Sequence, residues 1–211
     1  MIPDKNEWVK ALEERHGKRL QNKISSSIVA ICGLGGLGSN IAILLARAGV
    51  GKLILIDFDK VDITNLHRQQ YKACQIGMYK TEALACNLKE IAPYLEIEIH
   101  TVLMDEKNYF VLLENADIIC EAFDNAEAKA NIVNFVLSEM PTKYIVSASG
   151  MAGLDSANLI KTRKVSKRFY LCGDEKSDVK DGIGLVASRV SVCASHQANM
   201  VLRIITENFE E

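Results

Sequence analysis

The amino-acid sequence predicts an α/β fold, with a mostly parallel sheet, helices on both faces and antiparallel strands near the C-terminal end. Three observations carry this prediction. Short apolar runs of the buried-strand type alternate with stretches of helical periodicity from residue 28 to about residue 150. A glycine-rich turn separates the first of these runs from an apolar helix. After Gly150, two strand-like runs follow one another without a helix between them, which favours antiparallel pairing.

The elements before Gly150 follow from these patterns in order. Residues 6–20 are weakly amphipathic and predict a first helix. Apolar or alternating runs predict strands at 28–32, 53–57, 96–101, 117–120 and 144–147. Apolar residues at helical spacing predict helices at 39–48, 80–91, 106–114 and 125–139. The polar stretch 58–78 predicts a loop with short helical pieces. Strands joined by helices in this way pair in parallel through right-handed crossovers.

The C-terminal part breaks this rhythm. Residues 158–162 and 168–171 predict antiparallel edge strands, and the polar, glycine-bearing stretch 173–184 predicts a mobile loop. Residues 187–207 predict the last helix. The sequence contains no internal repeat and no linker, and 48% of its 211 residues are hydrophobic. We therefore expect one domain over residues 1–211 with a sizeable core.

Composition argues against several classes of function. The net charge is −2 and no block of like charge is present, so we expect no nucleic acid partner. The N-terminal residues are polar, and no apolar run approaches the ~20 residues of a membrane span, so we expect neither secretion nor a membrane. The six cysteines are scattered and form no CxxC pair, which predicts no disulfide framework and no zinc site. A cytoplasmic location fits this usage.

The glycine-rich turn reads Gly33-Leu-Gly35-Gly36-Leu-Gly38 and fits GxGxxG between a predicted strand and a predicted helix. Glycines allow a tight turn and a close approach of phosphate, and the helix N-terminus offers free N–H groups. Asp57 ends the next strand, about 20 residues beyond the turn, where an acid commonly receives ribose hydroxyls. The pattern predicts a Rossmann-like nucleotide site, without separating ATP from NAD or a flavin nucleotide.

Three further segments carry a resemblance to a known family. They read Asp57-Phe-Asp-Lys-Val-Asp-Ile-Thr-Asn-Leu-His-Arg-Gln-Gln70, Gly77-Met-Tyr-Lys-Thr-Glu82 and Phe123-Asp-Asn125. Together they resemble the ThiF and MoeB enzymes of the ubiquitin-activating-enzyme-like superfamily. The resemblance is strong over residues 28–150 and weaker towards residue 199, where the chain is similar to short ThiF-type proteins rather than to longer zinc-bearing members.

The resemblance implies a nucleotidyltransferase that uses ATP and Mg²⁺. Members of this family adenylate the C-terminal glycine of a small β-grasp sulfur carrier. Here the resemblance favours a ThiS-like carrier ending in Gly-Gly, in thiamine thiazole synthesis, and a homodimeric enzyme. Attack of the carboxylate on the α-phosphorus of ATP produces a mixed anhydride, and fixed cations with Mg²⁺ stabilise the charge on departing pyrophosphate. Molybdopterin-type or other ubiquitin-like carriers stay open as alternatives.

The resemblance also assigns the site residues. The ribose would bind Asp57 or Asp59, and Asp124 would bind Mg²⁺ directly or through water. The phosphates would contact Asn65, Arg68 and Lys80, next to the backbone of Gly33, Gly35, Gly36 and Gly38. Arg68, Lys80 and Asp124 form the catalytic set. A guanidinium fork and a compact ammonium both suit phosphate oxygens. From the residues alone, Asn65 and Asp62 could instead cap a local turn, and Gln69 is open as a phosphate contact.

Other readings compete with this one. A nicotinamide oxidoreductase explains the stretch 33–57 but leaves Asn65, Arg68, Lys80 and Asp124 without a task. A non-catalytic binding module, or an enzyme adenylating a carboxylate on tRNA or a peptide, would use the same fold. Relatives also use a cysteine, for which Cys172 is the best-placed candidate, although a packed thiol is the simpler interpretation. Arg15 is either a helix-surface charge or a residue that reaches a partner subunit's site.

Overall fold

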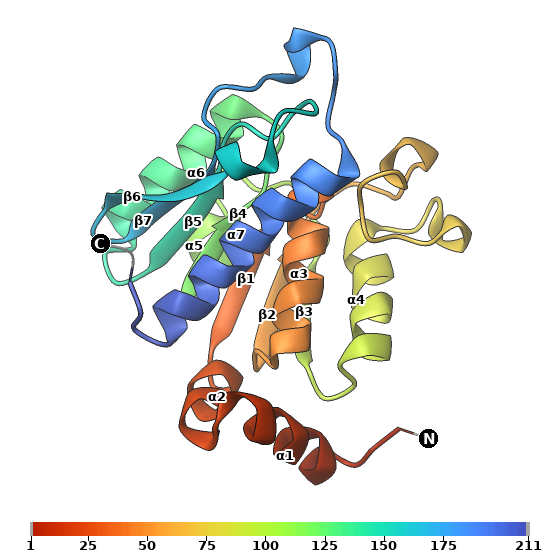
Figure 1. The fold of residues 1–211 in the computed structure, drawn as a ribbon, viewed down its shortest axis with the longest axis vertical. Helices are drawn as coiled ribbons and strands as arrows, with labels where there is room; N and C mark the ends of the chain where they lie inside the picture. The colour runs from red at the N-terminus through yellow and green to blue at the C-terminus, as the bar shows by residue number, and fades with distance from the viewer. Residues whose placement is uncertain (1, 210–211) are drawn as a thin grey trace.

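The computed structural model describes residues 2–209, and within them it contains a seven-stranded sheet of order β3-β2-β1-β4-β5-β7-β6 (Figure 1). The strands are β1 (Ile28–Cys32), β2 (Lys52–Ile56), β3 (Glu96–His100), β4 (Ile118–Glu121), β5 (Tyr144–Ala148), β6 (Lys161–Ser166) and β7 (Phe169–Gly173). Every neighbouring pair is parallel except β6–β7, which is antiparallel. The predicted fold class is confirmed.

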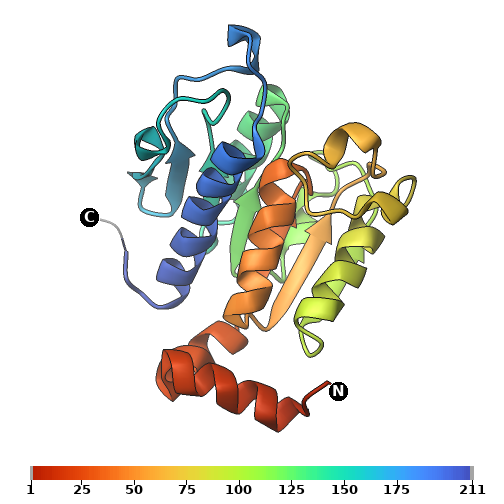
Figure 2. The same cartoon turned by 45° about the vertical axis from the view of Figure 1, so that its right-hand side comes forward.

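Helices cover both faces of this sheet. They are α1 (Lys5–His16), α2 (Lys18–Ser25), α3 (Gly36–Ala48), α4 (Lys80–Ile91), α5 (Tyr109–Leu113), α6 (Ala126–Glu139) and α7 (Ala187–Ile205). Short 3₁₀ turns are η1 (Ile63–Asn65), η2 (Ala73–Gln75), η3 (Ala157–Leu159) and η4 (Val179–Asp181). One face carries α3, α4 and α7, and the other carries α5 and α6 (Figures 1 and 2).

The central strands explain why the sheet is buried on both sides. In β1, Val29 and Ile31 belong to the core under α3, α4 and α7, whereas Ala30 and Cys32 belong to the core under α5 and α6. Apolar side chains that alternate between two covered faces produce a continuous apolar run rather than an alternating one. Because β1, β2 and β4 run parallel, their C-terminal ends lie at the same edge of the sheet, where β1 leads into the glycine turn.

The N-terminal helix is the clearest correction to the predicted elements. The predicted helix at 6–20 is two helices, α1 and α2, because Gly17 between them adopts φ +84. That left-handed conformation ends a helix and favours glycine. The His16 ring nitrogen Nδ1 lies 2.7 Å from Gln21 Oε1, and the Gln21 amide donates to the Gly49 carbonyl. Both helices lie at the end of the sheet opposite the glycine turn (Figure 1).

Two other boundaries differ from the prediction. The strand predicted at 158–162 exists as β6 but begins only at Lys161, because the Ser156 side chain accepts the Asn158 N–H and caps η3. Of the two predicted edge strands, β6 alone lies at the edge, since β7 pairs in parallel with β5. Helix α3 begins at Gly36, inside the glycine turn.

No helix among residues 2–209 combines the length and apolar character needed to cross a bilayer. The single-domain organisation stays a prediction.

Candidate nucleotide site at the carboxyl edge of the sheet

The glycine turn links β1 to α3 as predicted, but its glycines have different tasks. Gly33 adopts φ +89, and a Cβ there would lie 2.9 Å from the Ala122 carbonyl oxygen at the end of β4. A Cβ at Gly38 would collide with the Gly33 carbonyl. Gly35 is partly exposed, and the nearest atom to a Cβ there is 3.8 Å away. Gly33 and Gly38 therefore allow close packing, while Gly35 leaves backbone accessible to a ligand.

Two side chains hold the turn from the segment after β2. The buried Asp57 carboxylate accepts the Leu34 N–H at 2.6 Å, and the Tyr71 hydroxyl donates to the Leu34 carbonyl at 2.7 Å. Asp57 also accepts the Asp59 N–H at 2.8 Å, so both of its oxygens have backbone partners. Burial raises the pKa of Asp57, although attraction by Lys80 and these hydrogen bonds oppose it. Asp57 thus holds the turn, and its role as a ribose ligand stays a prediction.

Lys80 brings a buried positive charge to the same place. It is the first residue of α4 and only 5% exposed. Its Nζ donates to Asp59 Oδ2 at 2.7 Å and lies 4.0 Å from Asp57 Oδ2. The Asp59 side chain is 48% exposed, so one partner of this ammonium faces solvent. The structure therefore brings the predicted residues Lys80, Asp57 and Asp59 together at the end of β2.

Arg68 lies across the start of α3. Asn40 on α3 donates to the Gly36 carbonyl at 2.6 Å and to the Arg68 carbonyl at 3.2 Å, which fastens the Arg68 backbone to the glycine turn. The Arg68 Cγ lies 3.5 Å from the position of a Cβ on Gly36, and Nη1 donates to the Thr64 carbonyl at 3.2 Å. Within residues 2–209 the buried Nε of Arg68 has no hydrogen-bond partner. The Arg68 side chain, with its Nε–H unpaired among these residues, thus lies next to the glycine turn.

The neighbouring polar residues divide between turn-forming and site-facing roles. Asp62 accepts the Thr64 N–H, and Asn65 Oδ1 accepts the Asp62 N–H at 3.0 Å, so both residues cap η1. The capping alternative for Asp62 and Asn65 is therefore what the structure shows, while phosphate binding by Asn65 stays a prediction. Gln69 is buried with its amide next to Gly35, and its Oε1 lacks a partner in the described part of the chain.

Asp124 lies beyond the end of β4, beside the strand that leads into the glycine turn. It is exposed and precedes α6, whose N-cap Asn125 accepts the Ala128 N–H at 2.9 Å. Among residues 2–209, no three His, Cys, Asp or Glu side chains are grouped to hold a metal ion. An exposed carboxylate such as Asp124 suits Mg²⁺, which usually takes one or two carboxylates together with substrate phosphates and water. The donor set therefore fits a Mg·nucleotide rather than a resident metal.

A cavity of about 730 Å³ lies away from the glycine turn, at the C-terminal end of β7 and the N-terminal end of β6. Strands β4 and β5 separate β7 from β1 in the sheet, and the cavity walls include residues 152–155, the β6 residues 161–163 and the segment 173–178. The Arg189 guanidinium donates to Asp174 and to the Ala152 carbonyl, which fastens this segment to α7. Burial raises the pKa of Asp174, but hydrogen bonds from Ser177, Lys176 and Arg189 outweigh burial and lower the pKa to about 2.

The cysteines differ in exposure: Cys74, in η2, is exposed, whereas the strand cysteines are buried. Cys172 is fully buried in β7, with Sγ 3.5 Å from Thr162 Oγ1, as the packed interpretation predicts. Cys32 and Cys120 are buried in strands, and burial raises the pKa of both thiols. Cys86 is exposed on α4.

Two parts of the site were missed by sequence reasoning. Tyr71 is one aromatic residue in a polar loop, and nothing in its local pattern signals that its hydroxyl binds the glycine turn. Asn40 had a signal, because Ser39 and Asn40 interrupt an otherwise apolar helix. A buried polar side chain needs partners, so this interruption marks a place where another segment docks.

A model of the ThiF family matches residues 10–211. The chain is 37% identical over 114 residues to "Adenylyltransferase and sulfurtransferase MOCS3" of Aedes aegypti, covering 54% of this chain and 26% of that protein. It is 27% identical over 223 residues to "Adenylyltransferase and sulfurtransferase UBA4" of Lodderomyces elongisporus, covering 97% and 48%. The chain thus spans about half or less of these relatives. The Escherichia coli tRNA N6-threonylcarbamoyladenosine dehydratase TcdA, solved in complex with ATP, shares the fold with TM-score 0.86 at 18% identity, covering 99% and 98%.

Proposed function

The chain belongs to the ThiF family, and from that premise we propose that it adenylates the C-terminal carboxylate of a small sulfur-carrier protein, using Mg·ATP. The observation that carries the proposal is the pairing of two features at one edge of the sheet. The first is the glycine turn with Arg68, Lys80 and Asp124 around it. The second is the 730 Å³ cavity at the ends of β7 and β6, which we propose takes the C-terminal segment of the carrier.

The proposed reaction joins these two features. An oxygen of the carrier's terminal carboxylate attacks the α-phosphorus of ATP, a new O–P bond forms, and the bond between the α-phosphorus and pyrophosphate breaks. Negative charge grows on the departing pyrophosphate, where Arg68 and Lys80 supply fixed positive charge. Mg²⁺ held through Asp124 would neutralise phosphate charge. The attacking carboxylate is already ionised, so the step needs no general base.

The charges at the turn support this assignment over a purely structural one. A buried ammonium carries a desolvation cost, and the carboxylate that Lys80 contacts at hydrogen-bond distance is the half-exposed Asp59, with Asp57 farther away at 4.0 Å. Phosphate oxygens near Gly35 would accept from the Arg68 Nε, which has no hydrogen-bond partner among residues 2–209, and from the Lys80 ammonium. We propose that Lys80 exchanges part of its contact with Asp59 for phosphate when nucleotide binds.

The carrier is proposed by its chemistry. A chain end of two glycines lacks side chains, so it suits the approach from the cavity to the glycine turn. We propose a ThiS-like carrier because the C-terminal part of the chain is similar to short ThiF-type proteins. The carrier residues that precede its two terminal glycines would contact charged side chains on the cavity wall, namely Lys161, Arg163 and Glu175.

ATP–pyrophosphate exchange tests the proposal. The enzyme is assayed alone, with a ThiS-like carrier, with a molybdopterin-type carrier, and with each carrier lacking its two terminal glycines. We expect exchange that needs Mg²⁺ and an intact carrier, fastest with the ThiS-like protein. If tRNA, and not a carrier protein, stimulated the exchange, the proposed substrate would be wrong and a nucleic acid would take its place. If calorimetry showed tight binding of NAD and no binding of ATP, the protein would not be an adenylyltransferase, and the nicotinamide oxidoreductase would be favoured.

A further inference from the structure

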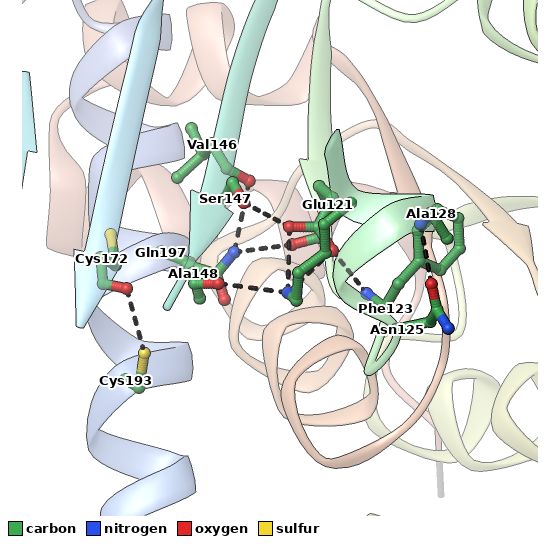
Figure 3. A network of polar contacts seen from close by, with 11 residues as sticks. Glu121, Phe123, Asn125, Ala128, Val146, Ser147, Ala148, Cys172, Cys193 and Gln197 are labelled. Carbon is green, nitrogen blue, oxygen red and sulfur yellow. Dashed lines mark hydrogen bonds and ion pairs between the residues drawn. The ribbon is translucent and has the colours of Figure 1, made fainter. Parts of the chain in front are cut away.

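A buried carboxylate three residues before Asp124 has no task in the proposed chemistry. Glu121, the last residue of β4, is 0% exposed. Its Oε1 accepts the Phe123 N–H at 2.7 Å, and its Oε2 accepts the Ser147 hydroxyl (Figure 3). Lys129 Nζ donates to both oxygens, at 3.0 and 3.1 Å. Because these donors come from three different segments, the turn after β4, strand β5 and helix α6, the side chain is held from several sides.

The same group of residues connects four elements at the carboxyl edge. Lys129, on α6, also donates to the Ala148 carbonyl at the end of β5 at 3.1 Å. Gln197, on α7, donates to the Glu121 carbonyl at 3.1 Å and to the Val146 carbonyl at 3.3 Å (Figure 3). Replacing a buried ion pair with apolar residues is often neutral or stabilising, so stability alone does not explain such a group. The relevant feature of this group is the segment that its side chains hold in place.

What it orients is the turn that carries Asp124. The hydrogen bond from Phe123 N–H to Glu121 fixes one side of this turn, and the Asn125 cap on α6 fixes the other. Ala122 in the same turn packs directly against Gly33, leaving no room for a Cβ there. The position of Asp124 relative to the glycine turn is therefore set by residues 121–125 and their anchors.

We infer that Glu121 and Lys129 are positioning residues, which hold the Asp124 carboxylate at the correct distance from the phosphates bound at the glycine turn. This inference rests on the proposed function, because it assumes that Asp124 acts on Mg·ATP. Residues of this indirect kind, which orient a metal ligand, typically change metal affinity or activity about 10–100-fold when replaced.

The direct test uses Glu121→Gln, which keeps the shape of the side chain and removes its charge. We expect the Mg²⁺ concentration for half-maximal exchange to rise and kcat to fall, together by about 10–100-fold, with little change in the KM for ATP. Calorimetry gives a readout that needs no turnover: the gain in ATP affinity on adding Mg²⁺ should shrink in the variant. Lys129→Met should behave like Glu121→Gln, and Lys129→Arg, which keeps the cation, should recover most of the loss.

A double-mutant cycle separates positioning from general damage. If Glu121 acts through Asp124, Glu121→Gln should cost less than about 2-fold in the Asp124→Asn background, because residues that act as a unit are not additive. Val136→Ala is the matched control: Val136 is buried on the same helix as Lys129 but packs in the core under α6, away from this group. It should lower stability without changing the Mg²⁺ dependence.

The outcomes decide between the alternatives. Fully additive losses, or a Glu121→Gln profile like that of Val136→Ala, would overturn the positioning role while leaving the proposed function intact. Normal Mg²⁺ dependence in Asp124→Asn would overturn the role of Asp124 itself, and the positioning role with it. Should Glu121→Gln not fold, the double variant Glu121→Gln/Lys129→Met removes both charges of the pair and takes its place in the cycle.

Discussion

Replacing Lys80 with alanine removes the buried positive charge at the end of β2, and its consequences follow from two distances. Lys80 Nζ lies 2.7 Å from Asp59 and 4.0 Å from Asp57, whose side chain is nearly as buried as its own. Two unit charges at 4.0 Å attract by about 4 kcal/mol at an effective dielectric constant of about 20. Part of this is offset by desolvation, so we expect Lys80→Ala to lower the free energy of unfolding by roughly 2–4 kcal/mol.

The catalytic loss should be separable from this loss of stability. Lys80 is assigned to charge that grows as pyrophosphate departs, and losing one such contact typically costs about 2.7–4 kcal/mol, or ~10²–10³ in rate. We expect the rate of carrier adenylation to fall by that factor, with a smaller fall in ATP affinity, because the contact strengthens in the transition state. Arg68→Ala should show the same pattern.

The assay is single-turnover adenylate formation at a temperature where each variant is folded, with ATP affinity measured by calorimetry. Cys172→Ala is the control, since Cys172 is buried in β7 and the adenylation step uses no thiol. It should keep a rate within about 3-fold of the unmodified protein, a change worth under 1 kcal/mol. Near-normal rates for Lys80→Ala and Arg68→Ala, with loss of activity in Cys172→Ala, would refute the assignment and move the chemistry to the cysteine.

Four further predictions concern other features of the protein. Gly38→Ala should destabilise the fold, by about 1–3 kcal/mol or more in a urea titration, because its Cβ would collide with the Gly33 carbonyl. Gly35→Ala should leave stability nearly unchanged and weaken ATP binding, because no atom lies within 3.8 Å of its Cβ. The pKa of Asp174 is lowered to about 2 from its ordinary value near 3.8. The stabilising contribution of this carboxylate is therefore present above pH 3.8 and is lost as the pH falls towards 2. Replacing Asp174 with asparagine should make the melting temperature less dependent on pH over that range. We also propose a homodimer, and light scattering that shows a monomer at micromolar concentration would contradict it.

The central part of the fold could be predicted from the sequence because its signals are local. The run 28–32 is apolar throughout, since β1 is covered on both faces, and Pro93 marks the end of α4. The N-terminal helix pair could not be predicted in this way. The break at Gly17 depends on a left-handed conformation that a glycine permits without requiring it. The boundary of β6 likewise depends on the Ser156 cap, a hydrogen bond that the strand pattern does not reveal.

The candidate site shows the same division. Motif spacing placed Lys80, Arg68 and Asp124 at the correct edge, because the carboxyl ends of parallel strands converge there. The partners of these residues come from distant segments. Tyr71 binds the glycine turn across the fold, and Lys129 meets Glu121 only because α6 packs beside β4. An acid that ends a buried strand, as Glu121 does, is a signal for such a partner, although the sequence does not name it.

Mass spectrometry of the carrier protein tests the central claim most directly. The enzyme, Mg·ATP and a ThiS-like carrier ending in Gly-Gly are mixed and quenched within one turnover, and the intact carrier and free nucleotides are analysed together. Adenylation predicts a carrier that gains one AMP at its C-terminal glycine, with release of pyrophosphate and no ADP. A carrier of unchanged mass, with ATP converted to ADP and phosphate or left intact, would contradict the proposed function.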